Sequence, residues 1–176
     1  MRTRPKIVVS DSSVLMDLAK AELIESTLAL PFEFMIPDVM LATELLDLGR
    51  YTGDGLVSLG FKRGGLDGAE VTTAMGYFRQ HRAQLSLNDC FAWRLAEVHK
   101  GILMTGDGDL RKLAERSGVE VHGALWAIDL IGRHRTCPTR HLVTGLTRLE
   151  KDPFVRLPRT VLRALKTKIE SDTWPG

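Results

Sequence analysis

The sequence predicts a three-layer α/β/α sandwich built around a parallel β-sheet. The first observation is that short apolar runs rich in β-branched residues alternate with longer segments of helical periodicity. The second is that acidic residues follow two of these runs, as ligand-binding side chains do at the carboxyl ends of parallel strands. Strands and helices that alternate in this way form β-α-β units whose helices cover the sheet. We therefore expect one α/β domain over residues 1–176, with extra C-terminal helices.

Five short apolar runs predict the strands of the sheet. The first covers residues 7–10 and leads into Asp11, Ser12 and Ser13, where Ser12 or Ser13 is expected to cap the following helix. The other four runs cover residues 32–36, 56–59, 102–105 and 119–121. Prolines bound the second run on both sides, because proline is excluded from strand interiors. The third run lies within a glycine-rich loop, where a short strand is expected.

Helical periodicity predicts the segments that connect and follow these strands. They cover residues 14–24 with an interruption near 20, 38–48, 67–82, 86–99, 110–116 and 124–131, and two further helices begin at residues 138 and 158. Gly49 is expected to end the second helix, and Ser86 with Asp89 has the pattern of a capping box. Proline at the start of the last two helices removes no intrahelical hydrogen bond. The inward positions of the last helix are expected to be Val161, Leu162, Leu165 and Ile169.

Length and composition limit the class of protein. The 176 residues suffice to bury a core without disulfides, and 44% hydrophobic with 26% charged residues is ordinary for a soluble globular protein. No apolar run approaches the roughly 18 residues of a membrane span, and the first run is too short for a signal peptide. Cys90 and Cys137 lack metal-ligand spacing, and Cys90 is expected to be a small buried hydrophobe. We expect a cytoplasmic protein that does not contact a membrane.

The net charge of +2 is unevenly distributed along the chain. Residues 133–168 carry ten basic and two acidic side chains, a net charge of +8, which leaves −6 for the remainder. A basic helical extension over residues 133–176 indicates an anionic partner, of which nucleic acid is the commonest. The alternative is a solvated helix face without a partner. The basic residues expected to contact RNA are Arg111, Arg159, Arg163 and Lys166.

Asp11 and Asp107 each follow a predicted strand, so both are expected at the carboxyl edge of the sheet. Asp107 lies between two glycines, which allow a sharp turn and a close approach of a ligand. The alternative for Asp11 is a purely structural helix cap. The alternative for Asp107 is a Gly-Asp-Gly turn in which Asp109 caps the next helix.

Glu44 and Asp89 lie on predicted helices. Glu44 interrupts the apolar face of its helix, where a carboxylate is costly unless it is paired or bound to a cation. Asp89 lies in line with the small residues Ala92 and Ala96, which let a helix approach the sheet. It is also placed as the acid of a capping box, and the two roles are compatible. For both acids a structural role remains open.

Four acids without a matching set of histidines or cysteines indicate a hard cation bound through oxygen. Mg²⁺ or Mn²⁺ fits, because these ions prefer oxygen ligands and bind substrate phosphates. Without a cation, four neighbouring carboxylates would repel one another. With one or two ions the site could activate water and stabilise a phosphate undergoing in-line displacement.

Four stretches of the sequence resemble, in order, the motifs of PIN-domain nucleases, the fold of the toxin in VapBC-type toxin–antitoxin pairs. These stretches are IVVSDSSVLMDLAK, IPDVMLATELLDLG, LSLNDCFAWRLAEVHKG and ILMTGDGDLRKLAERSGVEV. The resemblance covers roughly residues 5–135, and the tail around Leu157 and Pro158 is similar to the family's closing helix. The residues that match the family's four acids, in order, are Asp11, Glu44, Asp89 and Asp107.

The resemblance implies a Mg²⁺- or Mn²⁺-dependent endoribonuclease that cleaves single-stranded or structured RNA. It also implies a homodimer and, for a toxin, a neutralising antitoxin protein. Glu44 would position or deprotonate the attacking water. The residues expected to bind the ion are Asp11, Asp89 and Asp107. The residues expected to support these ligands are Ser12, Thr105 and Asp109.

Two other functions compete with the nuclease. The first is a catalytically silent PIN-like module that binds RNA or a partner and keeps the acids for structure, since no basic residue except Arg111 is placed to neutralise a transition state. The second is an α/β phosphatase for small phosphates. That mechanism requires a second acid two residues after Asp11, where the sequence has Ser13, so an aspartyl-phosphate intermediate is not expected.

Overall fold

The molecule is organised around a five-stranded parallel sheet. A computed structural model describes residues 4–43 and 48–172. The strands are β1 (Lys6–Ser10), β2 (Phe32–Pro37), β3 (Lys62–Gly64), β4 (Ile102–Met104) and β5 (Glu120–His122). They pair in the order β3-β2-β1-β4-β5, so the first strand is central and the connection from β3 to β4 crosses the sheet. The predicted α/β fold with a parallel central sheet is confirmed.

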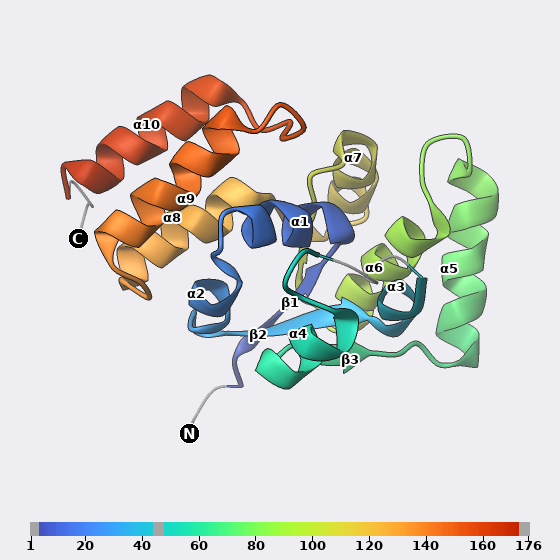
Figure 1. Ribbon diagram of the computed structural model, residues 1–176. Helices are drawn as coiled ribbons and strands as arrows, with labels where there is room; N and C mark the ends of the chain where they lie inside the picture. Colours follow the sequence, from blue (N-terminus) through green and yellow to red (C-terminus); the bar gives the residue numbers. More distant parts are fainter. Residues whose placement is uncertain (1–3, 44–47, 173–176) are drawn as a thin grey trace.

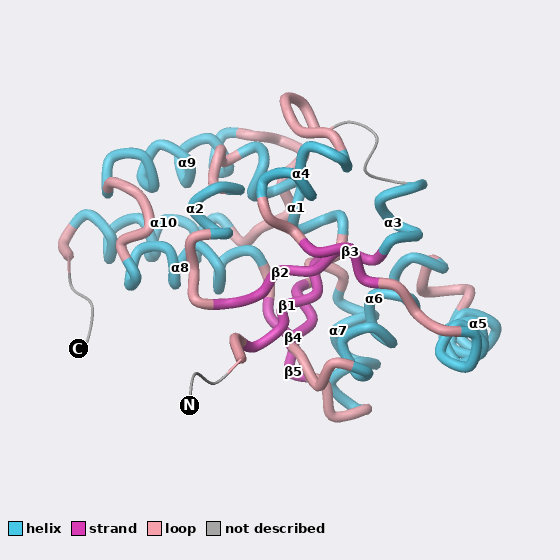
Figure 2. The backbone as a smooth tube through the Cα atoms, turned by 90° about the horizontal axis from the view of Figure 1, so that it is seen from below, coloured by secondary structure: helices cyan, strands magenta, loops and turns pink. Residues whose placement is uncertain are grey.

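Helices lie on both sides of the sheet (Figure 2). On one side lie α1 (Ser12–Lys20), α2 (Ile24–Leu28), α8 (Ala124–His134), α9 (Thr139–Lys151) and α10 (Arg159–Glu170). On the other lie α3 (Asp38–Thr43), α5 (Gly68–His81), α6 (Leu87–Val98) and α7 (Gly108–Arg116), while α4 (Gly53–Leu59) precedes the edge strand β3. This arrangement gives the three layers that the alternating sequence pattern predicts.

The core forms where α6 crosses the centre of the sheet. Val8 and Val9 of β1 and Ala92 and Ala96 of α6 are fully buried. Because alanine side chains are short, α6 lies close enough to contact β1, β2 and β4 at once. Cys90 is fully buried on the same helix, as predicted, and burial raises the pKa of its thiol to about 12.

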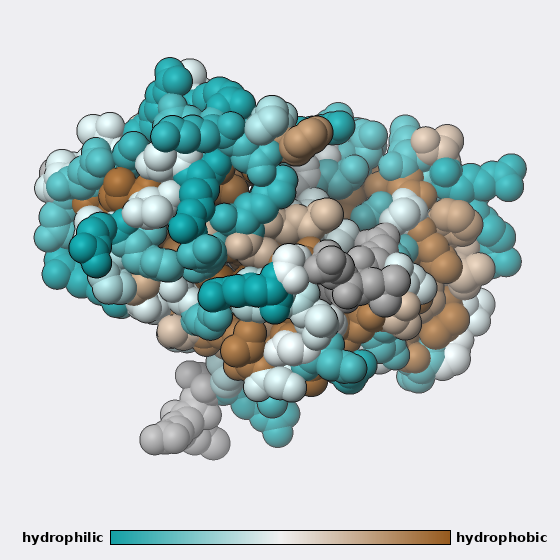
Figure 3. All heavy atoms as spheres, viewed as in Figure 1, coloured by the Kyte–Doolittle hydropathy of each residue, from teal (hydrophilic) through white to brown (hydrophobic). Residues whose placement is uncertain are grey.

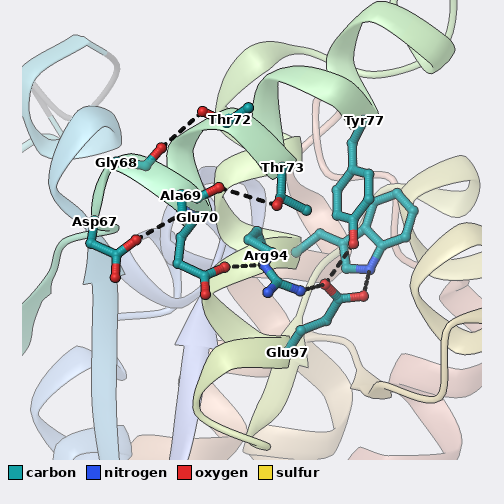
Figure 4. Close-up of polar contacts among 10 residues, drawn as sticks. Asp67, Gly68, Ala69, Glu70, Thr72, Thr73, Tyr77, Arg94 and Glu97 are labelled. Carbon is teal, nitrogen blue, oxygen red and sulfur yellow. Dashed lines mark hydrogen bonds and ion pairs between the residues drawn. The ribbon is translucent and has the colours of Figure 1, made fainter.

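The long helix α5 lies at the outer edge of the molecule and packs on α6 (Figures 1 and 4). Arg94 of α6 forms two ion pairs. Its Nε lies 2.5 Å from Oε2 of Glu70 on α5, and its NH1 lies 2.7 Å from Oε2 of Glu97 on α6. The hydroxyl of Tyr77 donates to Glu97 at 2.8 Å, and its ring stacks on Trp93 with centroids 4.2 Å apart. These contacts join α5 to α6, and apolar packing adds to them through the buried Ala74 and the partly buried Tyr77 and Phe78.

The prediction of a strand at 56–59 is wrong, because this segment belongs to helix α4. Thr52 caps the helix by accepting a hydrogen bond from the amide of Gly55 at 3.0 Å. Gly53 and Leu56, three residues apart, are buried, while Leu59 is 43% exposed, so the segment follows the helical period. The edge strand β3 comes immediately afterwards and is more polar, because an edge strand needs no continuous apolar run.

Two further expectations differ from the structure. Val161, predicted to face inward, is 47% exposed, whereas the other three predicted core positions of α10 are buried, since the helix buries a narrow stripe spaced three and four residues apart. The helix predicted for residues 38–48 is described only to Thr43, because 44–47 lie outside the described residues. Leu48 already forms an antiparallel bridge with Tyr51, and Gly49 takes φ +70 in this turn. The helix therefore does not reach Leu48.

The C-terminal helices extend the layer that contains α1 (Figure 1). Leu142, Leu146 and Leu149 of α9 are buried in the main hydrophobic core. Hydrophilic side chains cover much of the outer face of α9 and α10 (Figure 3). None of the helices within the described residues has the length and apolar character needed to span a membrane.

Candidate active site

Two of the candidate acids, Asp11 and Asp107, lie where the central parallel strands end. Asp11 directly follows β1, and Asp107 follows β4, the strand that pairs with β1. The amide of Asp11 donates to the carbonyl of Met104 at 2.9 Å, which continues the pairing of these two strands into the turn. The carboxyl edge of β1 and β4 therefore places both acids as the strand pattern predicts.

Asp11 is the most deeply buried of these acids, with 3% of its surface exposed. Its Oδ2 accepts a hydrogen bond from the hydroxyl of Thr105. Its Oδ1 accepts from the hydroxyl of Ser13 at 2.8 Å and from the amide of Val14 at 3.0 Å. Burial raises the pKa of Asp11 despite these bonds, and the negative charge of Asp89 raises it further.

Asp11 itself caps α1, so the expectation that Ser12 or Ser13 does so is wrong. Its backbone is extended, with φ −82 and ψ 171, and both serines already lie inside the helix. The Ser13 hydroxyl also accepts from the amide of Gly106 at 3.1 Å. Ser13 thus links the start of α1 to the loop after β4, whereas Ser12 is half-buried without a described bond to Asp11.

Asp107 caps α7, with its Oδ1 accepting from the amides of Asp109 at 2.9 Å and Leu110 at 2.7 Å. The alternative in which Asp109 caps this helix is therefore wrong. Asp109 is exposed, with its Oδ1 3.7 Å from Nζ of Lys112. The amide of Asp107 donates to Oγ1 of Thr105 at 3.0 Å, so the Thr105 side chain bridges Asp11 and Asp107.

Asp89 belongs to the capping box predicted for α6: its Oδ2 accepts from the amide of Ser86 at 2.7 Å, and its amide donates to the hydroxyl of Ser86 at 3.1 Å. The neighbouring Asn88 is buried and donates to Oγ1 of Thr43 at 3.0 Å. This bond joins the start of α6 to the end of α3. Glu44, the next residue after Thr43, lies outside the described residues.

The chemistry of these donors fits a hard divalent cation. Every candidate ligand is a carboxylate oxygen, the type preferred by Mg²⁺ and Mn²⁺. Within the described part of the chain, residues 4–43 and 48–172, neither Asp11 nor Asp107 takes part in an ion pair. No hydrogen bond from these residues reaches Oδ2 of Asp107. The same described residues contain no group of three acid, histidine or cysteine side chains that could hold a metal ion.

The basic residues named from the sequence lie in different surroundings. Arg111 is half-buried and donates to the carbonyls of Val121 at 3.1 Å and Thr105 at 3.3 Å, so it ties together the chain segments at the ends of β4 and β5. Arg159 is exposed on α10, and Lys166 is half-buried there. Arg163 is exposed, but its Nε lies 2.5 Å from Oε1 of Glu150.

Two polar residues of this edge are missed by sequence reasoning. Ser13 contacts Asp11 directly, and Asn88 connects α6 to α3. The signal for Ser13 is its place in the Ser-Asp-Ser-Ser stretch, which does not distinguish the two later hydroxyls. Asn88 could have been found because it directly precedes the candidate ligand Asp89 on a predicted helix. Polar side chains that are buried at such positions are normally hydrogen-bonded.

Comparison of the sequence with models of known protein families identifies one family. A profile described as a PIN domain (DUF3368) matches residues 7–171, nearly the whole chain. The chain belongs to the PIN domain family. PIN domains are generally nucleases that use divalent metals, and the acids at the carboxyl edge lie inside the matched region of this PIN domain. None of the curated proteins searched matches the chain.

Proposed function

We propose that this PIN domain is a Mg²⁺- or Mn²⁺-dependent endoribonuclease. The observation that supports it is the buried carboxylate of Asp11, held by two hydroxyls, one of which also contacts the amide of Asp107. Burial disfavours the charged form of Asp11 despite these hydrogen bonds, and a bound cation would offset that cost. A helix cap alone does not require this burial, because capping acids elsewhere in the chain, such as Asp67, are exposed.

Each acid has a distinct task in this proposal. Asp11, Asp89 and Asp107 would hold the ion, and Glu44 would orient or deprotonate the attacking water. When bound, the ion lowers the pKa of water and stabilises charge on the phosphate. Thr105 and Ser13 fix the Asp11 carboxylate, so that its geometry is set before substrate binds.

We also propose a biological setting for this nuclease, based on the resemblance of its motifs to those of VapBC-type toxins. It cleaves single-stranded or structured RNA in the cytoplasm as the toxin of a toxin–antitoxin pair, forms a homodimer and is neutralised by an antitoxin protein. The unequal charge distribution supports an RNA substrate, because the extension at 133–168 carries a net +8.

A cleavage assay with matched variants tests this function. We expect the purified chain to cut a fluorescent RNA with Mn²⁺ and to stop when EDTA is added. Asp11→Asn should lower the rate by about 100-fold or more, because a neutral amide is a poor ligand for a divalent ion. Its melting temperature should equal or exceed that of wild type, since the substitution removes a buried charge. Failure of wild type to cleave any RNA with either metal contradicts the proposal.

Asp67→Asn is the control. Asp67 caps α5 through the amide of Glu70 at 3.0 Å, as Asp11 caps α1 through Val14, but it lies on the peripheral helix pair. This variant should keep full activity. Equal losses in both variants would show that helix capping, not metal chemistry, explains the effect.

One observation favours a second function. Because the described acids do not form a group of three metal ligands, a catalytically silent module that binds RNA or a partner is the competing proposal. Calorimetric titration with Mn²⁺ separates the two. A site of millimolar affinity or better that is lost in Asp11→Asn supports the nuclease, whereas no binding heat supports the silent module.

A further inference from the structure

The connection between α9 and α10 presents one aromatic ring to solvent. Phe154 is 83% exposed, more than any other large hydrophobic side chain among residues 4–43 and 48–172. Leaving a ring of this size in water forfeits the favourable free energy of burying it. Figure 1 shows that this connection projects beyond the ends of the two helices. The ring is therefore placed where a partner could cover it.

The backbone around Phe154 is firmly held. Oδ1 of Asp152 accepts from the amide of Phe154 at 2.7 Å, and Oδ2 lies 3.1 Å from Nζ of Lys20 at the end of α1. The amide of Phe154 and the ammonium of Lys20 lower the pKa of Asp152, so the carboxylate stays charged at neutral pH. Val155, the next residue, is buried in the core. A turn anchored on both sides displays the ring with little entropic cost on binding.

Basic side chains flank the ring. Lys151 precedes Phe154 by three residues and Arg156 follows it by two, so their Cα atoms lie within about 11 Å of that of Phe154. Both are exposed, and neither takes part in the ion pairs formed between the described residues. Arg159, at the start of α10, is exposed in the same way. An aromatic ring between cations is the combination that binds single-stranded nucleic acid, through base stacking and phosphate contacts.

We propose that Phe154 stacks on a base of single-stranded RNA while Lys151 and Arg156 contact the adjacent phosphates. A protein partner would be expected to bury a larger apolar surface. Two or three positions from Phe154 lie the charged residues Lys151, Asp152 and Arg156, two of them basic, and charge complementarity favours a polyanion. This inference rests on the proposed function, because it names how the RNA substrate is held away from the acids.

Binding measurements in EDTA test the inference without cleavage. Fluorescence anisotropy of a labelled 12-mer of uridylate gives Kd for the full chain. Phe154→Ala should raise Kd by at least about fivefold, the lower end of the effect of losing one base–aromatic stack. Phe154→Trp should restore Kd to within about twofold of wild type, and its fluorescence should be quenched by the RNA. Phe154→Leu, which keeps an apolar side chain, should bind as weakly as Phe154→Ala.

Val161→Ala is the matched control, because Val161 is an exposed apolar residue, at 47%, on the same basic extension. It should leave Kd within about twofold of wild type. The slope of log K against log salt should be unchanged in Phe154→Ala, since the ring contacts no phosphate. It should decrease by about 1.4 in a Lys151→Gln, Arg156→Gln double variant, at about 0.7 for each phosphate contact to a single strand.

The outcomes distinguish this inference from the proposed function. If wild type binds and cuts RNA but Phe154→Ala binds equally well, the stacking site is overturned and the nuclease stands. If wild type cuts RNA with Mn²⁺ but does not bind the 12-mer in EDTA, the stacking site is overturned and the nuclease stands. If wild type neither binds nor cuts RNA, both fall. If Phe154→Ala keeps its RNA affinity but loses self-association in analytical ultracentrifugation, Phe154 contacts a second copy of the chain, and the stacking site is overturned.

Discussion

At the residue scale, Thr105 holds the candidate site together. Its hydroxyl donates to Asp11 and accepts from the amide of Asp107, and its backbone amide donates to the carbonyl of His122 at 2.9 Å. One fully buried side chain therefore sets the relation of two acids that are 96 positions apart in the sequence. The pattern of acids after strands predicts the edge where this happens, but not the hydroxyl that connects them.

A second acid on α1 gives a prediction about pH and stability. Burial raises the pKa of Asp17 to about 6, and the charges of Asp11 and Asp152 contribute to this rise while Lys20 opposes it. Because the folded pKa lies above the unfolded value of 3.8, the native state binds more protons between these values. The free energy of unfolding therefore falls as pH rises from about 4 to about 6.

Asp17→Asn should remove the fall in the free energy of unfolding between about pH 4 and pH 6. At pH 7 the variant should be more stable than wild type by about 1–2 kcal/mol, because solvent screening reduces the effect at this partly exposed site, and the difference should disappear below about pH 4. Urea unfolding at both pH values measures it. Asp38→Asn, at an exposed acid, should change stability by less than about 0.5 kcal/mol at either pH. An Asp17→Asn variant that is less stable than wild type at pH 7 would contradict the assigned effect of burial.

At the scale of the elements, three of the candidate acids contribute to helix N-termini. Asp11, Asp89 and Asp107 each satisfy backbone amides at the start of α1, α6 and α7. A carboxylate at a helix N-terminus is stabilised by the helix dipole and the free amides, so local structure alone accounts for part of their placement. From the sequence, helix capping is the alternative to metal binding for Asp11, whereas the alternative for Asp107 is a turn in which Asp109 caps the next helix. The structure shows that capping uses Oδ1 of both acids.

The packing of α9 on the first helical layer gives a prediction that depends on one glycine. A Cβ at Gly145 would lie 2.7 Å from the carbonyl oxygen of Ala21 and 3.3 Å from its Cβ. Gly145→Ala should therefore destabilise the protein by about 1–3 kcal/mol, as overpacking does. Urea unfolding monitored by circular dichroism measures the change.

Gly76→Ala is the matched control for this prediction. Gly76 also lies inside a helix, α5, but a Cβ at this position would have no neighbouring atom within 4 Å. Alanine is there expected to stabilise the protein by about 0.5–1 kcal/mol, because it limits the unfolded chain and favours the helix. If both variants changed stability in the same direction, close approach of α9 would not explain the role of Gly145.

At the scale of the whole molecule, the basic residues of the C-terminal extension lie on other elements than the candidate acidic ligands. The basic residues at 133–168 lie on α8 to α10 and the loops between them, while the candidate ligands lie at the ends of β1 and β4 and the start of α6. The exposed face of α9 and α10 is largely hydrophilic (Figure 3). If RNA reaches the acids, the extension supplies affinity through phosphates and the acids supply chemistry.

Salt dependence tests the contribution of α10 to RNA binding. Neutralising Arg159 and Lys166 to Gln should lower the slope of log K against log salt by about 1.4, or about 0.7 for each contact. Arg163→Gln should have a smaller effect, because the Arg163 guanidinium already pairs with Glu150. Anisotropy titrations over a range of KCl concentrations give the slopes. Unchanged slopes in all variants would assign α10 to packing or to contacts between subunits.

Much of the fold follows from the sequence because it is written in local patterns. Four of the five predicted strands and most helices lie close to their predicted residues, since apolar period and turn chemistry act over a few neighbours. The segment at 56–59 misled this reasoning because four residues fit both periods. The Thr52 cap and the burial of Gly53 and Leu56 on one side are consistent with the helix.

The sequence by itself determined the parallel α/β fold, the edge at which Asp11 and Asp107 lie, and the basic character of the extension. Tertiary structure decided which hydroxyl holds Asp11, which acid caps which helix, and that Arg111 binds backbone carbonyls. The physical reason is the separation along the sequence of the residues that interact. Strand and helix preferences depend on near neighbours, whereas hydrogen bonds such as that between Thr105 and Asp11 join residues that meet only when the sheet forms.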